Sequence, residues 1–336
     1  MAAKHILDNI KSSYGTTAAL ASRVATFTED TGLKLTLSNF LQYYHLDPRS
    51  IYKYTSFSNL CKKAGMISAC KEPAEDILTK ALFRFALVDS RRWIAFLLDF
   101  LKNIDDTDIS LLSDEHKKML QMFYITIWGK AIEDWDSEEV YDNLYALSDS
   151  PTMLSELTEL LQYNYNRIDF IDQPLDLGFT SPLDLYCTYT RDQLLLALDH
   201  MNPATVREGI KWLPEKQCDL LFITLNKSDK DYSPTTLYHD YSINEWLFHW
   251  QSQSTTSEHS STGQRYIYHR KQGSKVLLFV RENKNDPITK KAAPYTYLGT
   301  ASYVKHEGSK PMNITWHLDH PIPAKYLKKT NKLVVG

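Results

Sequence analysis

The sequence predicts an α+β protein in which an all-α N-terminal domain is followed by a β-rich pseudo-barrel domain with a few helices. Apolar residues recur at helical spacing through the first half of the chain, whereas the second half holds short β-branched and aromatic runs bounded by turn-forming residues. The chain also has 336 residues, more than the ~250–300 at which a single core stops growing. We therefore expect an α-helical domain over residues 1–170, a linker over 171–186 and a β-rich domain over 187–336.

The first domain is expected to consist of consecutive helices. Apolar residues follow a helical spacing in four segments, at residues 37–44, 73–101, 113–127 and 151–161. Ser113 opens the third segment, and Ser150, with Pro151 at the first helical position, opens the fourth. No part of this region shows the alternation typical of a strand, so the domain is predicted to be all helical.

The second domain begins after a segment with the composition of a linker, since residues 171–186 contain two prolines and a glycine with weak periodicity. A short helix is expected over residues 191–199, with Thr190 as its N-cap. Five runs rich in β-branched and aromatic residues predict strands, at residues 219–225, 264–269, 275–281, 295–304 and 312–318. At least one helix is expected within residues 236–250. Short strands between turn clusters favour a compact barrel or a sandwich.

Charge is distributed unevenly along the chain. Residues 1–185 hold 18 Lys and Arg against 27 Asp and Glu, whereas residues 186–336 hold 20 against 14. Within the second part, residues 265–336 hold 14 basic and 4 acidic side chains. Such a basic block attracts polyanions, and nucleic acid is the first candidate because each neutralised phosphate releases a counterion. The alternative is a solvated basic face that balances the acidic half of the same chain.

The composition favours a cytoplasmic protein without membrane contact. No apolar run approaches the ~20 residues needed to cross a bilayer, and the first residues contain no apolar signal core. The four cysteines, at positions 61, 70, 187 and 218, form no CxxC pair, which is typical of a reducing compartment.

Several catalytic motifs are missing from the sequence. It has no P-loop for nucleotide hydrolysis, no G-x-S-x-G elbow, no H-E-x-x-H helix and no Cys/His zinc spacing. We therefore expect no intrinsic cofactor and no motor activity in this chain.

Polar and aromatic residues gather between positions 224 and 266. Aromatic faces can stack on bases, amides and hydroxyls can read base edges, and lysine and arginine can hold phosphates. We predict phosphate contacts by Lys227, Arg265, Arg281, Lys290 and Lys291. The remaining candidates for a DNA-binding surface are Asn226, Tyr232, Tyr238, His249, Trp250, Gln251 and Gln253. The alternative is that Phe248 and Trp250 are core residues and that the Ser, Gln and Thr run is a hydrophilic loop.

A second possibility is that the chain is itself a metal-dependent nuclease. Nucleases of the PD-(D/E)xK type use an acidic residue followed later by an acid and a lysine one residue apart, which hold a divalent cation and polarise water or phosphate. Glu282 and Lys284 follow the apolar run 276–280, and Asp219 could be the distant acid at a magnesium site. A Glu-x-Lys pair is common by chance, and Asp219 is 63 positions upstream of Glu282.

Residues 224–323 resemble a known bacterial domain. The segments that carry the resemblance are Thr224-Leu225-Asn226-Lys227, Tyr232-Ser233-Pro234-Thr235-Thr236, Phe248-His249-Trp250-Gln251, Phe279-Val280-Arg281-Glu282, Tyr297-Leu298-Gly299 and Pro311-Met312-Asn313-Ile314-Thr315-Trp316. The domain, formerly of unknown function, lies at the C-terminal end of large restriction helicases that carry a phospholipase-D-like nuclease at their N-terminus. Residues 35–41 and 51–61 are similar to the region that follows the helicase lobes in those enzymes.

The resemblance implies that the C-terminal domain is a target-recognition module for double-stranded DNA. Because this chain lacks the family's nuclease and ATPase motor, the resemblance also implies partner subunits that supply both activities, with magnesium bound by the complex. The expected function is the DNA-recognition component of a multi-subunit restriction endonuclease system that cleaves foreign double-stranded DNA. A third possibility is a non-catalytic assembly scaffold whose acidic helical domain docks a partner.

Overall fold

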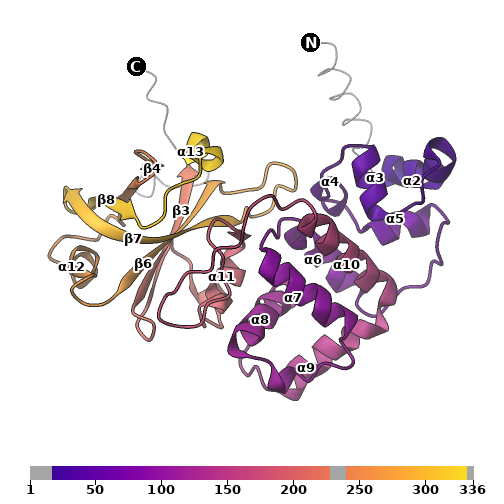
Figure 1. The fold of residues 1–336 in the computed structure, drawn as a ribbon, viewed down its shortest axis with the longest axis horizontal. Coiled ribbons are helices and arrows are strands. Elements are labelled where there is room, and N and C mark those ends of the chain that lie inside the picture. Colours follow the sequence, from indigo (N-terminus) through magenta and orange to yellow (C-terminus); the bar gives the residue numbers. More distant parts are fainter. Residues whose placement is uncertain (1–16, 228–239, 331–336) are drawn as a thin grey trace, which may run out of the picture. The chain divides into compact units, whose positions relative to one another are not determined.

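The computed structural model describes residues 17–227 and 240–330 (Figure 1). The chain forms two compact units. The first comprises Met1–Asp172 with Leu195–Asn202 and Pro287–Lys290, and the second comprises Gln173–Leu194 with Pro203–Asp286 and Lys291–Gly336. A helical N-terminal region followed by a C-terminal sheet confirms the predicted mixed α+β class.

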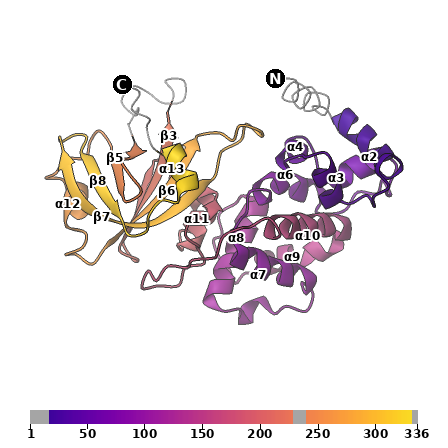
Figure 2. The ribbon, with the colours of Figure 1, turned by 45° about the horizontal axis from the view of Figure 1, so that its top comes forward.

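The first unit is built from helices. In chain order they are α2 (Thr17–Thr31), α3 (Leu37–Tyr43), α4 (Arg49–Tyr52), α5 (Phe57–Lys63), α6 (Glu75–Phe85), α7 (Arg91–Lys102), η1 (Ile109–Leu111), α8 (Asp114–Trp128), α9 (Glu138–Tyr145), η2 (Ala146–Asp149) and α10 (Pro151–Tyr165). Residues 17–170 contain no strand, as predicted. Helix α10 packs against α3, α5, α6 and α7 and forms the centre of this unit (Figure 2).

Local capping explains where these helices begin. The Ser113 hydroxyl accepts a hydrogen bond from the His116 N–H at 3.3 Å, and Pro151 is the first residue of α10. The apolar segment 73–101 divides into two helices because Ser90 caps α7, its hydroxyl accepting from the Trp93 N–H at 3.2 Å. In the sequence this apolar stripe runs without a break. In the structure the Ser90 cap begins a second helix with an axis of its own.

Carboxylates from α10 hold the N-termini of two other helices. Glu156 accepts hydrogen bonds from the N–H groups of Phe57 and Ser58 at 2.7 and 2.8 Å, and Glu159 accepts from Leu37 and Ser38 at 3.2 and 2.9 Å. These N–H groups have no partner within their own helix, and a negative charge is favoured at a helix N-terminus. The acidic side chains therefore join α10 to α5 and to α3.

The second unit is a mixed sheet with a few helices. Its elements are β1 (Thr188–Tyr189), α11 (Arg191–Ala197), η3 (Pro203–Thr205), β2 (Ile210–Leu213), β3 (Cys218–Asn226), β4 (Tyr241–Ser242), β5 (Leu247–Gln251), α12 (Ser261–Tyr268), β6 (Lys275–Asn283), β7 (Tyr295–Glu307), β8 (Asn313–Leu318) and α13 (Ala324–Thr330). The strand order is β2-β3-β6-β7-β8-β5-β4, and β1 pairs with β7. Strands β3 and β6 are parallel, whereas the other pairs are antiparallel.

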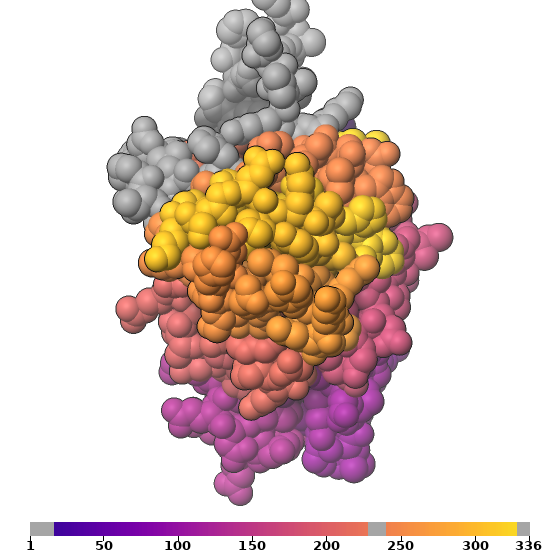
Figure 3. All heavy atoms as spheres, turned by 90° about the vertical axis from the view of Figure 1, so that its left-hand side faces the viewer, coloured from indigo at the N-terminus to yellow at the C-terminus, as the bar shows by residue number. Residues whose placement is uncertain are grey.

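The predicted pseudo-barrel is not confirmed. Over the part of the chain that the structure describes, β2 and β4 stand at opposite ends of the strand order and do not pair with each other. In the space-filling view the orange and yellow segments, from the last third of the chain, form one continuous face of this unit (Figure 3). Within the described residues the strand order does not close into a barrel.

Two predictions about single elements are wrong. Residues 264–269 were expected to be a strand, but residues 264–268 belong to α12 and His269 is its C-cap; Ser260 caps the start of this helix by accepting from the Gly263 N–H at 3.1 Å. Gly263 and Tyr266 are both buried, three residues apart on one helix face, and this spacing outweighs the β-propensity of the tyrosines. A helix was expected within 236–250, but residues 240–250 contain β4 and β5. Residues 236–239 lie outside the described residues.

The other expected elements are confirmed. Strands β3, β6, β7 and β8 occupy the predicted runs, and α11 begins after Thr190. Thr190 and Gln193 cap each other: the Gln193 N–H donates to the Thr190 hydroxyl at 3.2 Å, and the Thr190 N–H donates to the Gln193 side-chain oxygen Oε1 at 2.9 Å. The described residues contain no helix long and apolar enough to cross a membrane.

The core of the second unit covers one face of its sheet. Phe248 and Trp250 point into this core from β5, and Trp316 and Tyr266 reach it from β8 and α12. Trp250 and Tyr266 meet edge to face, with ring centres 5.5 Å apart. Phe248 is fully buried and Trp250 is 5% exposed, so both are core residues, as the alternative interpretation proposed.

Candidate nucleic-acid interface

A cleft of about 580 Å³ opens on the second unit. Its walls come from the start of α11, the residues before β2, and strands β3, β5, β6 and β7 with the residues that follow β5 and β6. The basic residues in the walls are Arg191, Arg207, Lys227, Arg281 and Lys284, and the acidic ones are Glu208 and Asp240. Basic side chains therefore outnumber acidic ones in this cleft.

Because side chains alternate between the two faces of a strand, aromatic rings from β3, β6 and β7 lie on the same side of the sheet as the basic residues of the cleft. Phe222 and Thr224 lie on the same face of β3 because side chains two residues apart point the same way. Phe222 stacks on Phe279 of β6, with ring centres 5.3 Å apart, and meets Tyr295 of β7 edge to face at 5.4 Å. The opposite face of the same strands carries Ile223 and the apolar core. The cleft therefore has a rigid aromatic floor.

Arg281 is held in the cleft by neutral groups. It lies opposite Thr224 in the β3–β6 register, and its Nε donates to the Thr224 hydroxyl at 2.9 Å. Its Nη1 donates to the Ala293 carbonyl at 3.1 Å, and its guanidinium carbon lies 4.5 Å from the centre of the Tyr295 ring. The side chain is fixed in direction, and no carboxylate among the described residues neutralises its charge.

Lys227 differs from Arg281 because a buried carboxylate pairs with it. Lys227 Nζ lies 2.8 Å from Asp240 Oδ2, and the two side chains are 7% and 1% exposed. Asp240 also accepts from the Gln251 N–H at 2.9 Å, so it fixes the end of β5. Burial raises the pKa of the Asp240 carboxyl, and the Lys227 ammonium opposes that shift. The pair has a structural role in the wall of the cleft.

The predicted base-facing residues separate in the structure. Trp250, Gln251 and Gln253 line the cleft, and the Gln253 amide donates to the Glu208 carboxylate. His249 does not line the cleft; it lies on the face of β5 opposite Trp250, where it stacks on Tyr241 with ring centres 4.8 Å apart. Tyr232 and Tyr238 lie outside the described residues.

The other predicted contacts lie away from the cleft walls. The Arg265 guanidinium makes two hydrogen bonds to the Asp219 carboxylate, at 2.7 and 2.8 Å, and lies 4.2 Å from the Trp212 ring. Asn226 donates to Asn283 across β3 and β6. Lys290 and Lys291 are exposed in the connection between β6 and β7 and do not line the cleft.

The structure does not bring the three nuclease candidates together. Asp219 lies opposite Val276 in the β3–β6 register, and Glu282 lies six residues farther along β6. At ~3.3 Å per residue this is about 20 Å, too far for the two carboxylates to share a metal ion. Burial raises the pKa of the Asp219 carboxyl, and Arg265 opposes the shift. Across the described ranges no group of three His, Cys, Asp or Glu side chains could hold a metal ion.

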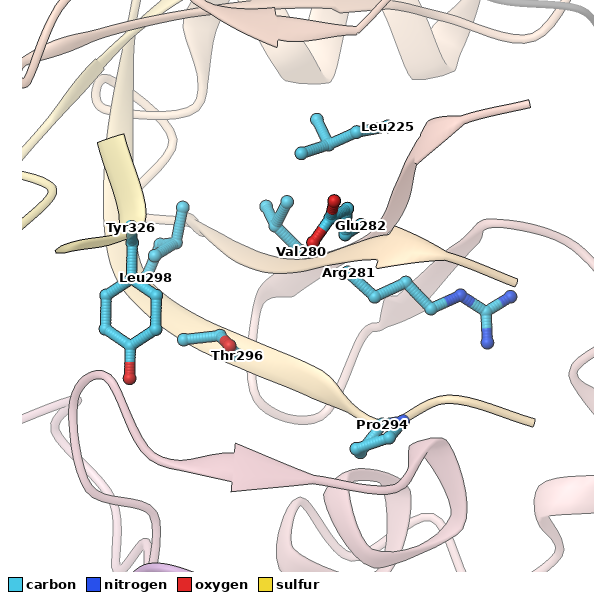
Figure 4. A pocket seen from close by; sticks show the side chains of 8 residues that line it. All are labelled: Leu225, Val280, Arg281, Glu282, Pro294, Thr296, Leu298 and Tyr326. Atoms are coloured by element: carbon cyan, nitrogen blue, oxygen red, sulfur yellow. The ribbon is translucent and has the colours of Figure 1, made fainter. Parts of the chain in front are cut away.

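Glu282 belongs to a separate small pocket. This pocket of about 120 Å³ is lined by Leu225, Val280, Leu298 and Tyr326 as well as Glu282 (Figure 4). Lys284 lines the large cleft instead. Glu282 lies at the end of strand β6 and Lys284 directly after it, and the two side chains line different cavities.

Sequence reasoning missed several residues of the cleft. Arg191, Arg207, Phe222 and Tyr295 all line it, and none was predicted as a contact. Arg191 carried one local signal, since it follows the N-cap Thr190 at the predicted start of a helix. The other three come from separate strands or loops, and only the sheet register brings them together.

Residues 183–329 match a family described as a domain of unknown function, DUF3427. The match covers 147 of 336 residues, slightly less than half of the chain, and includes every wall residue of the cleft. No curated protein matches the chain.

Proposed function

We propose that this chain is the DNA-recognition component of a multi-subunit restriction endonuclease system that cleaves foreign double-stranded DNA. Partner subunits supply the nuclease and the nucleotide hydrolysis, magnesium is bound by the complex, and the system acts in the cytoplasm. The BsuMI restriction enzyme is the system that we propose for it. The recognition domain is proposed to be a pseudo-barrel of the kind that grips duplex DNA.

The observation that carries this proposal is the uncompensated positive charge of the cleft. Arg281 is fixed by Thr224, Ala293 and Tyr295, none of which carries a negative charge. An arginine held in this way is pre-oriented for phosphate, which accepts two parallel hydrogen bonds from its planar fork. Gln251, on the wall of the same cleft, carries an amide suited to base edges.

The test is binding of the purified chain to fluorescent duplex DNA over a salt titration. Methylated and unmethylated duplexes serve as competitors, together with a scrambled duplex. We expect the logarithm of the association constant to fall linearly with the logarithm of salt concentration, with a slope of about −0.9 per phosphate contacted. We also expect one duplex to bind at least tenfold more tightly than the scrambled one, since recognition proteins exceed their non-specific affinity by ~10³ or more.

Arg281→Ala is the informative variant, and Arg270→Ala is its matched control. Arg270 is also an arginine of the second unit, but its side chain is 73% exposed and lies outside the cleft. Loss of one phosphate contact should reduce the slope by about 1 in Arg281→Ala alone. Equal affinity for all duplexes would contradict recognition and favour an assembly scaffold with non-specific DNA contact.

A further inference from the structure

The charges in the cleft divide into compensated and uncompensated groups. Lys227 is neutralised by Asp240, and Arg265, outside the cleft, is neutralised by Asp219. Arg281 has no such partner, and its Nη2 makes no hydrogen bond to any described residue. A guanidinium nitrogen without an internal partner at the wall of a cleft is available to a ligand.

Two further arginines of the same cleft are also unpaired. Neither Arg191 nor Arg207 makes a hydrogen bond or an ion pair with another residue of the described chain, and Arg207 is exposed. The one uncompensated acid in the walls is Glu208, which accepts from the neutral Gln253 amide. Three guanidinium groups facing one cavity favour an anion that carries more than one negative charge.

The charge of the phosphate distinguishes the possible ligands. A phosphate inside a DNA strand is a diester with one negative charge, whereas a terminal phosphate monoester carries about −1.5 to −2 near neutral pH. The five basic side chains in the walls exceed the two acidic ones, Glu208 and Asp240, by three positive charges. This excess matches the monoester better than the diester.

The size of the cleft selects a single nucleotide. Its volume of about 580 Å³ lies within the ~300–1,000 Å³ of sites that enclose drug-sized ligands, and one nucleotide is of that size. A duplex, whose major groove alone is ~12 Å wide, can lie across the mouth of this cavity but cannot fill it, whereas a single nucleotide can. The rings of Phe222 and Tyr295 provide an apolar floor, and Thr224 provides a hydroxyl.

We propose that the cleft binds the phosphorylated end of a DNA strand, with the terminal phosphate monoester on Arg281, Arg191 and Arg207 and its nucleotide on the aromatic floor. This inference rests on the proposed DNA-recognition function and names the part of the DNA that enters the cleft. The cleaved ends of foreign DNA present this group, so the site would hold a product or a processed end.

The test compares strands that differ only in their terminal group. Fluorescence polarisation of the full chain is measured with one oligonucleotide sequence, single-stranded or as a duplex with an overhang, carrying a 5′-phosphate, a 3′-phosphate or hydroxyl ends. We expect one phosphorylated end to bind roughly tenfold more tightly than the hydroxyl end, as charge-assisted hydrogen bonds imply. Equal affinities of phosphorylated and hydroxyl ends would overturn the inference and leave the proposed function standing.

Arginine variants test whether the preference for phosphorylated ends comes from the cleft. Arg207→Ala removes an exposed side chain without internal partners, so it should fold normally and reduce the preference for phosphorylated ends several-fold. Arg281→Ala should abolish that preference, with a circular-dichroism melt to confirm folding, whereas Arg270→Ala should retain it in full. A preference that survives in both cleft variants would contradict the site.

Competition by inorganic phosphate shows whether the cleft binds the end of a DNA strand or any free phosphate anion. We expect it to compete only at concentrations far above the dissociation constant of the oligonucleotide, because it lacks the nucleotide. Competition by inorganic phosphate as effective as that by the phosphorylated strand would overturn the strand-end assignment. If no DNA of any kind bound at low salt, the proposed function itself would fail.

Discussion

In the helical unit a buried carboxylate accepts hydrogen bonds from backbone N–H groups, whereas in the β-rich unit two buried carboxylates form ion pairs with cationic side chains. Glu156 is 4% exposed and accepts from the N-terminus of α5, and no cation among the described residues pairs with it. Asp219 and Asp240 are equally buried, but Arg265 and Lys227 neutralise them. Buried negative charge therefore has a structural role in both units. Backbone N–H groups stabilise it in the helical unit, and cationic side chains stabilise it in the β-rich unit.

This comparison shows which charges are free for function. The net charge of a segment counts paired and unpaired groups alike, so it overstates the number of lysines and arginines that a ligand can reach. Lys227 and Arg265 contribute to the basic balance of the second part of the chain, yet each is neutralised internally. Among the described residues of the cleft, Arg281, Arg191 and Arg207 carry a charge that no carboxylate neutralises.

The largest expected effect comes from Lys227→Ala, which breaks a compensated pair in the β-rich unit. Asp240 would remain buried without its cation, and removal of one partner from a buried ion pair costs about 3–5 kcal/mol. A thermal melt followed by near-ultraviolet circular dichroism should show a large loss of stability. Lys284→Ala, a lysine of the same cleft, is the control. A loss below about 1 kcal/mol in Lys227→Ala would show that the pair is not structural.

Glu156→Gln tests the helical unit in the same way. The carboxylate accepts from two N–H groups and from the Ser58 hydroxyl, whereas glutamine offers one acceptor oxygen and turns an NH₂ group toward a donor. Hydrogen bonds to charged groups contribute about 1.5–3 kcal/mol, so we expect a loss of that size in urea unfolding. Glu159→Gln, at a half-buried site, should lower the free energy of unfolding by less than Glu156→Gln does. The reverse order would contradict the role of burial.

Arg207→Ala tests the opposite expectation, that an uncompensated charge serves binding and not stability. Because Arg207 is exposed and has no partner in the described part of the chain, its removal should change the free energy of unfolding by no more than about 0.5 kcal/mol. The slope of DNA affinity against salt should fall by about 1. Unchanged DNA binding in this variant would indicate that the unpaired arginine is solvated and functionally silent.

The smallest expected effect concerns a partly buried contact between Glu258 and His306. A hydrogen bond from His306 lowers the pKa of the Glu258 carboxyl from its ordinary value. A carboxyl with a lowered folded-state pKa contributes stability above its ordinary pKa of about 4.3, and that contribution is lost as pH falls through the folded pKa. In an NMR titration, Glu258 should change protonation at a more acidic pH in the native protein than in His306→Ala. Identical titrations would show that the contact does not form in solution.

Much of the fold follows from local signals in the sequence. Ser113 and Thr190 predict helix starts that the structure confirms, because a cap depends on groups only three residues apart. The runs that became β3, β6, β7 and β8 were also readable, since each is long and rich in β-branched and aromatic residues. Residues 264–269 were not, because two tyrosines and an isoleucine suit either a strand or a helix until their neighbours in the core are known.

Only part of the candidate site could be predicted from the sequence. Lys227, Trp250, Gln251, Gln253 and Arg281 were predicted from composition and line the cleft. Arg265 was predicted with equal reason, yet it is paired with Asp219. No property of a single residue distinguishes the two cases, because the distinction depends on whether a carboxylate lies nearby.

The sequence by itself determined most of the helices and strands, several of their caps and the uneven distribution of charge, because these depend on residues close together in the chain. The tertiary structure decided which charges are compensated and which residues share the cleft. Arg281 meets Thr224, 57 positions away, through the parallel register of β3 and β6. Parallel strands are joined by a crossover and not by a tight turn, so neither periodicity nor local spacing records their register.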